Sequence, residues 1–136
     1  MNELRIESRA EAIDDARTWV TEGLRTEGIG EKDLWAIQLA LTEVLSNVMR
    51  HAYSGDRTRE IWLTSRFADD RLELEILHWG APLEAENRSS DAHLDTAPQG
   101  GYGLHLIDEL VDEVERREAP GGGTVITLVK SRWDHS

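Results

Sequence analysis

The sequence predicts an α+β fold, in which helices gather on one face of a mixed, mostly antiparallel sheet and form a two-layer α/β sandwich. Two features predict it. Segments with a helical period follow one short alternating strand, and the remaining strands come in pairs that short turns join. The expected order along the chain is β-α-α-β-β-loop-α-β-β.

The first half of the chain carries one strand and two helices. Residues 3–8 alternate as a strand does, and Ser8 with Glu11 three positions later matches a capping box that opens a helix. A longer helix is expected from about residue 31 to about residue 53. The apolar face of the first helix recurs at intervals of 3, 4 and 4 residues: Ile13, Ala16, Val20 and Leu24.

The second half carries the paired strands. Residues 58–67 and 71–78 are expected to be strands around the tight turn 68–70. Residues 84–99 are polar and lack periodicity, which is typical of a functional lid or of a disordered loop. A helix follows the glycines at 100–103, and the last two strands are expected around 113–118 and 124–131. One face of the strand 71–78 is formed by Leu72, Leu74, Ile76 and His78.

Length and charge restrict the class of protein. The 136 residues fit a single domain, 1–136, and can bury a core without disulfides, which the lack of cysteine excludes. No apolar run approaches the roughly 18 residues of a membrane span, so we expect a soluble, cytoplasmic protein with no membrane partner. The formal net charge of −12 disfavours direct nucleic-acid binding and suits protein partners or a metal-bound ligand.

Three polar side chains mark the longer helix. Glu43, Asn47 and His51 fall at i, i+4 and i+8, so they line one stripe beside the apolar face of the helix. A carboxylate, an amide and an imidazole in a row suit the lining of a site at the edge of the core. A solvated helix face is the alternative that the spacing alone leaves open.

A glycine-rich turn opens the third helix. The segment 100–104 reads Gly-Gly-Tyr-Gly-Leu at the point where a loop becomes a helix. Glycines let the backbone approach a ligand closely, and the free N–H groups at a helix start favour an anion such as phosphate. An ordinary hinge ahead of a helix would have the same sequence, so this turn is weak support by itself.

These pieces together resemble the GHKL ATPase superfamily, which includes gyrase-type ATPases and the catalytic domains of histidine kinases. The stretch from Glu43 through Asn47 to the His-Ala-Tyr at 51–53 is similar to the N box of that superfamily. The segment 78–82, His-Trp-Gly-Ala-Pro, stands in the place of its first glycine box, and Gly-Tyr-Gly-Leu at 101–104 resembles the second. The resemblance covers nearly the whole chain. The short length of the chain and the His-Ala-Tyr that ends its N box look like those of anti-sigma-factor serine kinases of the RsbW and SpoIIAB kind.

The resemblance implies ATP and Mg²⁺ as cofactors. It makes Glu43 the catalytic general base toward a substrate serine and Asn47 the Mg²⁺ ligand, roles that suit a carboxylate and an amide oxygen. It places the phosphates at the backbone of the second glycine box and makes residues 84–99 the cover of ATP. The nucleotide-binding residues that it implies are Asn47, His51, His78, Gly80, Gly101, Gly103 and Leu104.

His78 departs from the family pattern. The first glycine box of the family begins with an aspartate that accepts a hydrogen bond from the adenine amino group. A neutral imidazole has one acceptor nitrogen, whereas a protonated one has none. Three interpretations stay open: ATP binds in spite of the change, the domain keeps the fold and binds a partner without nucleotide, or the site has been retuned toward another ligand. A structural histidine in a lost site is the plainest account of His78 itself.

The first functional hypothesis is an ATP-dependent anti-sigma-factor serine/threonine protein kinase. It would phosphorylate an anti-sigma factor antagonist and sequester a sigma factor, and relatives of this kind allow a homodimer. The alternative is a degenerate GHKL-fold regulatory module that binds protein partners without nucleotide, which His78 and the acidic charge favour. A sensor histidine kinase is less favoured, because the sequence has no helical phosphoacceptor segment ahead of the ATPase-like part.

Overall fold

A computed structural model describes residues 2–79, 107 and 109–131. These residues form two helices and five strands, and a single turn of π-helix extends the second helix. In chain order the elements are β1 (Asn2–Glu7), α1 (Glu11–Arg25), α2 (Glu31–Asn47), the π-helical turn (Val48–Ala52), β2 (Glu60–Ala68), β3 (Arg71–His78), β4 (Glu113–Glu118) and β5 (Thr124–Lys130). The expected strands and the first two helices are therefore confirmed, with shifts of a few residues at their ends.

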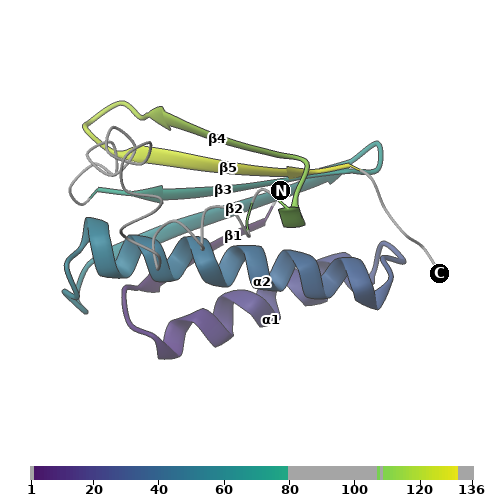
Figure 1. Ribbon diagram of the computed structural model, residues 1–136, viewed down its shortest axis with the longest axis horizontal. Helices are drawn as coiled ribbons and strands as arrows, with labels where there is room; N and C mark the ends of the chain where they lie inside the picture. The colour runs from purple at the N-terminus through teal and green to yellow at the C-terminus, as the bar shows by residue number, and fades with distance from the viewer. Residues whose placement is uncertain (1, 80–106, 108, 132–136) are drawn as a thin grey trace.

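The five strands form one sheet in the order β1-β2-β3-β5-β4, and every neighbouring pair is antiparallel. Both helices lie against the same face of this sheet, so the molecule has two layers (Figure 1). The other face of the sheet carries no helix from the described residues. The prediction of an α+β sandwich with helices on one face is confirmed, and among the described strands the sheet is wholly antiparallel.

The turn between β2 and β3 fixes the register of the central hairpin. Ala68 pairs with Arg71, so only Asp69 and Asp70 lie between the strands. Both have a φ of 56°, the left-handed region that a two-residue turn of type I′ requires. This register carries the even-numbered residues of β3 to the helix-covered face, and it ends with His78 opposite Thr124 of β5.

The start of α1 differs from the expected capping box. The residue before the helix is Ala10, and no side chain caps the helix there. The Ser8 hydroxyl donates instead to the backbone carbonyl of Asp56, which lies 48 positions away in the chain. A long-range bond to the segment ahead of β2 therefore takes the hydroxyl that local pattern had assigned to the helix.

The end of the second helix also differs from expectation. The regular α-helix stops at Asn47, and the backbone N–H of Tyr53 donates to the Val48 carbonyl over 3.0 Å, an i to i−5 bond typical of a π-helix. Ser54 and Gly55 then end the helix with φ values of 51° and 82°. Because a π-turn holds more residues than an α-turn, residues 48–52 no longer follow the 100° step of the stripe that contains Glu43 and Asn47.

The core lies between the helices and the covered face of the sheet. Its largest fully buried side chains come from α2, β2, β3, β5 and the segment at residue 107: Ile37, Leu41, Leu45, Ile61, Leu63, Leu74, Ile76, Ile107 and Leu128. At the far end of this layer, Lys130 of β5 pairs with Asp33 in the first turn of α2 at 3.6 Å. Within the described residues, no helix is long and apolar enough to span a membrane.

Candidate nucleotide site

The polar stripe of the second helix separates into three levels of exposure. Glu43 is half-buried, Asn47 is buried with 7% of its surface exposed, and His51 is exposed. Glu43 and Asn47 are neighbours one turn apart in the regular α-helix. His51 belongs to the π-helical turn that follows. A buried amide beside a half-buried carboxylate is the pairing that the sequence led us to expect at the edge of the core.

The amide oxygen of Asn47 already has a cationic partner. The Arg50 guanidinium donates a hydrogen bond to Asn47 Oδ1 at 3.2 Å, from three positions further along the chain. Arg50 is exposed, so its side chain reaches back over the buried amide from the solvent side. The sequence interpretation did not single out Arg50, although an arginine at i+3 is a common helix-surface partner for a side-chain oxygen.

His78 is fully buried at the end of β3. Its exposed fraction is 0%, and neither ring nitrogen has a hydrogen-bond partner in the described structure. Buried polar atoms in proteins are nearly always hydrogen-bonded, and leaving one unpaired costs roughly 1–3 kcal/mol. Among the described residues, His78 therefore lacks the hydrogen bond that a buried structural histidine usually makes.

Tyr53 holds the ring of His78 in place. The two rings meet edge to face, with centroids 6.1 Å apart and planes at 90°. The Tyr53 hydroxyl donates to the Glu60 carbonyl at 2.5 Å and accepts the backbone N–H of Trp79 at 3.0 Å. Burial raises the pKa of Tyr53 above its usual value, so the phenol stays neutral. Tyr53 thus ties the π-helical turn to the start of β2 and to the end of β3.

The charge state of His78 follows from its surroundings. Burial, followed by the positive charge of Arg116 as the smaller cause, lowers the pKa of His78 to about 4. Arg116 shares the helix-covered face of the sheet, because its β-sheet partner Ile126 also pairs with Ile76 of β3. The imidazole is therefore neutral at physiological pH and offers one donor and one acceptor nitrogen.

Four of the expected site residues lie outside the described residues: Gly80, Gly101, Gly103 and Leu104. The same holds for the expected lid at 84–99 and for the glycine-rich turn. Of the helix expected after that turn, the apolar residues Ile107, Leu110 and Val111 are described; Ile107 and Val111 are buried, and Leu110 is half-buried. The described half of the site is therefore the part formed by α2, the π-helical turn and β3.

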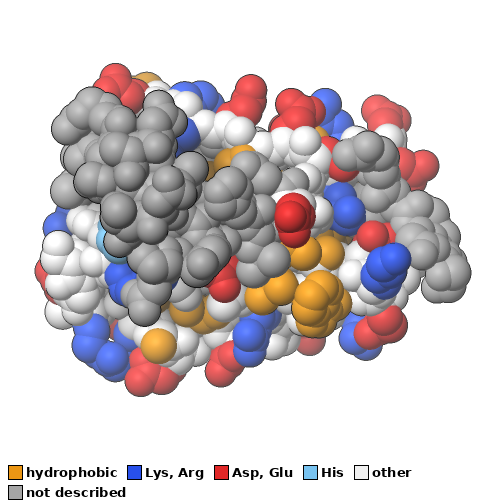
Figure 2. All heavy atoms as spheres, viewed as in Figure 1, with side chains coloured by type: hydrophobic (Ala, Val, Ile, Leu, Met, Phe, Trp, Pro, Cys, Tyr) orange, Lys and Arg blue, Asp and Glu red, His pale blue; other side chains and the backbone are white. Residues whose placement is uncertain are grey.

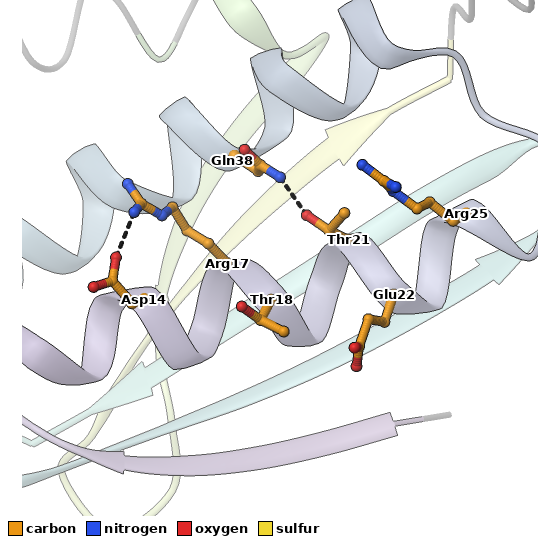
Figure 3. A pocket seen from close by; sticks show the side chains of 7 residues that line it. All are labelled: Asp14, Arg17, Thr18, Thr21, Glu22, Arg25 and Gln38. Carbon is orange, nitrogen blue, oxygen red and sulfur yellow. Dashed lines mark hydrogen bonds and ion pairs between the residues drawn. The ribbon is translucent and has the colours of Figure 1, made fainter.

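A second hollow lies elsewhere. An open groove of about 450 Å³ runs between α1 and α2, and none of the expected site residues lines it (Figure 3). Gln38 of α2 donates to the Thr21 hydroxyl of α1 across the groove, and Arg17 pairs with Asp14 within α1. Among the described residues, no group of three or more His, Cys, Asp or Glu side chains could hold a metal ion.

An antiparallel sheet covered on one face by two helices defines the class of two-layer α+β sandwiches (Figure 1). The chain belongs to the histidine kinase-like ATPase domain family, whose model matches residues 6–130. This confirms the resemblance that the N box and the glycine boxes indicated.

The curated relatives are more specific. The serine-protein kinase RsbW of Bacillus pumilus is 27% identical over 144 residues, which cover 98% of this chain and 89% of the relative. RsbW of Bacillus subtilis is 25% identical over 142 residues, with the same two coverages of 98% and 89%. The chain is thus similar over nearly its whole length to proteins named as serine-protein kinases.

Solved structures agree on the fold. The RsbU and RsbW domains of a Mycobacterium tuberculosis protein match with a TM-score of 0.67 and 21% identity over 96% of this chain, which spans 32% of that protein. The SiaB–SiaC complex of Pseudomonas aeruginosa matches with a TM-score of 0.71 and 10% identity, over 95% of this chain and 88% of that one.

The burial of His78 predicts a pH-dependent stability. In the unfolded chain the imidazole takes up a proton near pH 6.5, whereas the folded protein resists protonation down to about pH 4. The stability that comes from keeping His78 neutral is full above pH 6.5 and is lost progressively as the pH falls toward 4. Between these limits, wild type should lose roughly 1–3 kcal/mol more free energy of unfolding than His78→Leu.

Urea denaturation at intervals from pH 7.5 to 4 measures this difference. His78→Asn serves as the control, because it keeps a polar side chain at the position but removes the titrating group. Equal losses of stability in wild type and in both variants would contradict the burial of a neutral imidazole.

Proposed function

We propose that this protein is an ATP-dependent serine/threonine protein kinase of the anti-sigma type, formed by a single domain over residues 1–136. The observation that carries the proposal is the fully buried imidazole of His78, whose ring nitrogens have no hydrogen-bond partner among the described residues. The family membership and the serine-protein kinases among the relatives support it.

The described residues fit a nucleotide with Mg²⁺. A neutral imidazole can accept a hydrogen bond from the adenine amino group, and His78 has an acceptor nitrogen with no partner in the described structure. Mg²⁺ prefers oxygen ligands, and Asn47 Oδ1 is the amide oxygen of a buried residue whose present partner, Arg50, is exposed. His51, Gly80, Gly101, Gly103 and Leu104 would complete the nucleotide contacts, and residues 84–99 would cover them.

Glu43 is the proposed general base. When bound, Mg-ATP supplies the phosphoryl group and neutralises the charge that builds up on it. The Glu43 carboxylate accepts the proton of the substrate serine hydroxyl, which makes the hydroxyl oxygen a better nucleophile. Its half-buried place on α2, one turn before Asn47, lets it act at the mouth of the site rather than inside it.

The partners that suit this kinase are an anti-sigma factor antagonist, which carries the serine, and a sigma factor, which the kinase sequesters while the antagonist is absent. The SiaB–SiaC complex has the same fold on one side of a protein–protein contact, which supports a protein substrate. A cytoplasmic homodimer with no nucleic-acid or membrane contact is part of the same proposal, in keeping with the net charge of −12.

The first test of the proposal is Mg-ATP binding by calorimetry, followed by transfer of labelled phosphate to antagonist proteins of the same organism. We expect micromolar binding and phosphoserine on one antagonist. Absence of Mg-ATP binding would favour the degenerate regulatory module instead. Binding without phosphorylation of any antagonist would contradict the kinase part and keep the nucleotide site.

Glu43→Gln should abolish most of the activity while it spares binding. Removing a general base lowers the rate by about 10²- to 10⁴-fold, and the amide keeps the size of the side chain. Calorimetry should give an Mg-ATP affinity within about threefold of wild type, since Glu43 is not among the nucleotide ligands. The control is Glu31→Gln, an exposed glutamate at the start of the same helix. Wild-type phosphorylation by Glu43→Gln would refute the base assignment.

Arg50 should set the Mg²⁺ concentration that the site needs. Its guanidinium lies 3.2 Å from the oxygen that would bind the metal, so two positive charges would meet within about 5 Å. Arg50→Gln should therefore lower the Mg²⁺ concentration for half-maximal ATP binding by roughly 2- to 10-fold.

A titration of Mg²⁺ at fixed ATP measures this midpoint. Arg57→Gln is the matched control, because it removes the same charge from an exposed arginine that pairs with Glu11. An unchanged midpoint in Arg50→Gln would show that Arg50 and the metal do not compete. A raised midpoint would show that Arg50 assists nucleotide binding.

A further inference from the structure

We propose that His78 makes the nucleotide site accept both 6-amino and 6-oxo purine nucleoside triphosphates, where the family aspartate selects the 6-amino base. This inference rests on the proposed nucleotide site and names its substrate class. It begins from the two buried ring nitrogens of His78, which have no hydrogen-bond partner among the described residues.

The two side chains differ in what they can offer a base. An ionised aspartate carries only acceptors, so it pairs with the amino group of adenine and repels a carbonyl oxygen at the same position. A neutral imidazole carries one donor and one acceptor. The nitrogen that faces the base accepts from a 6-amino group in one tautomer, and donates to a 6-oxo group in the other.

The protein does not fix the tautomer of His78. In most proteins the proton position on a histidine is set by the hydrogen bond that the second nitrogen makes. Here the second nitrogen of His78 is as unpartnered as the first. The hydroxyl of Tyr53, whose ring packs against His78, is occupied by the Glu60 carbonyl and by the N–H of Trp79. No hydrogen bond from the described residues therefore favours one tautomer of His78 over the other, so the tautomer that suits the base can be the one that binds it.

The ring itself stays in place while the proton changes position. Tyr53 packs edge to face against His78, and strand pairing of His78 with Thr124 holds the backbone. Neighbouring Arg116 and the burial of the ring keep the imidazole neutral, so the acceptor form exists at physiological pH. A fixed ring that can present either a donor or an acceptor nitrogen therefore discriminates weakly between a 6-amino and a 6-oxo purine.

The experiment compares Mg-ATP and Mg-ITP binding to the full chain by calorimetry. ITP carries a 6-oxo group and lacks the 2-amino group of GTP, so the pair differs at the base position that His78 would read. Wild type should bind the two nucleotides with affinities within about threefold of each other. His78→Asp should prefer ATP by about 10- to 100-fold, as expected for gaining a charge-assisted bond to one base and a repulsion to the other.

His78→Asn provides a second variant if the aspartate variant fails to fold. Its amide also has a donor and an acceptor, so it should keep an ATP to ITP ratio within about threefold of unity. A wild-type preference for ATP of tenfold or more, or equal ratios in wild type and His78→Asp, would overturn the inference and leave the nucleotide site intact. Binding of neither nucleotide would overturn the proposed function together with it.

Discussion

Both helices of this protein cover the same face of an antiparallel sheet, and that one-sided burial determines where every other feature lies (Figure 1). The apolar side of α2, with Leu41 and Leu45 fully buried, must face the sheet. Its polar stripe then comes to the edge of the core, where Asn47 is buried and Glu43 is half-buried. The same constraint directs the alternating residues of β3 inward, and the last of them is a histidine.

His78 is the costly residue in this arrangement. Every other even position of β3, namely Leu72, Leu74 and Ile76, is apolar and buried. An imidazole in the same row gains no hydrogen bond from the described residues. Because burial and the charge of Arg116 lower its pKa, the ring is neutral. A leucine there would cost less, so the protein alone gives no reason for the histidine. A ligand that bonds to the ring gives one.

The outer surface of the molecule has a different character. Figure 2 shows acidic and basic side chains interspersed on the visible face, with hydrophobic side chains gathered over the N-terminal half of α2. Trp35 lies in that part of α2 and is 59% exposed, whereas Glu43 is half-buried and Asn47 and His78 are buried. The groove between α1 and α2 is polar and open. None of the residues that line this groove belongs to the proposed site.

Sequence pattern predicted what depends on period and local turn chemistry. The two-residue alternation placed His78 on the buried face of β3, and the helical period placed Asn47 at the edge of the core. Sequence pattern did not predict the bonds between distant segments. The Ser8 hydroxyl donates to the Asp56 carbonyl rather than capping its own helix, and the Tyr53 hydroxyl bonds to the start of β2 and to the residue after β3. That His78 has no hydrogen-bond partner among the described residues is also a property of packing, which no local pattern contains.

The central claim is that a nucleotide completes the hydrogen bonding of His78. ¹⁵N NMR of the histidine side chains tests it most directly, with His78→Asn used to assign the His78 signals. The account predicts a neutral ring without hydrogen bonds in the free protein, and a shift of one His78 nitrogen on addition of Mg-ATP. Unchanged His78 nitrogens in protein that calorimetry finds saturated with Mg-ATP would contradict the account.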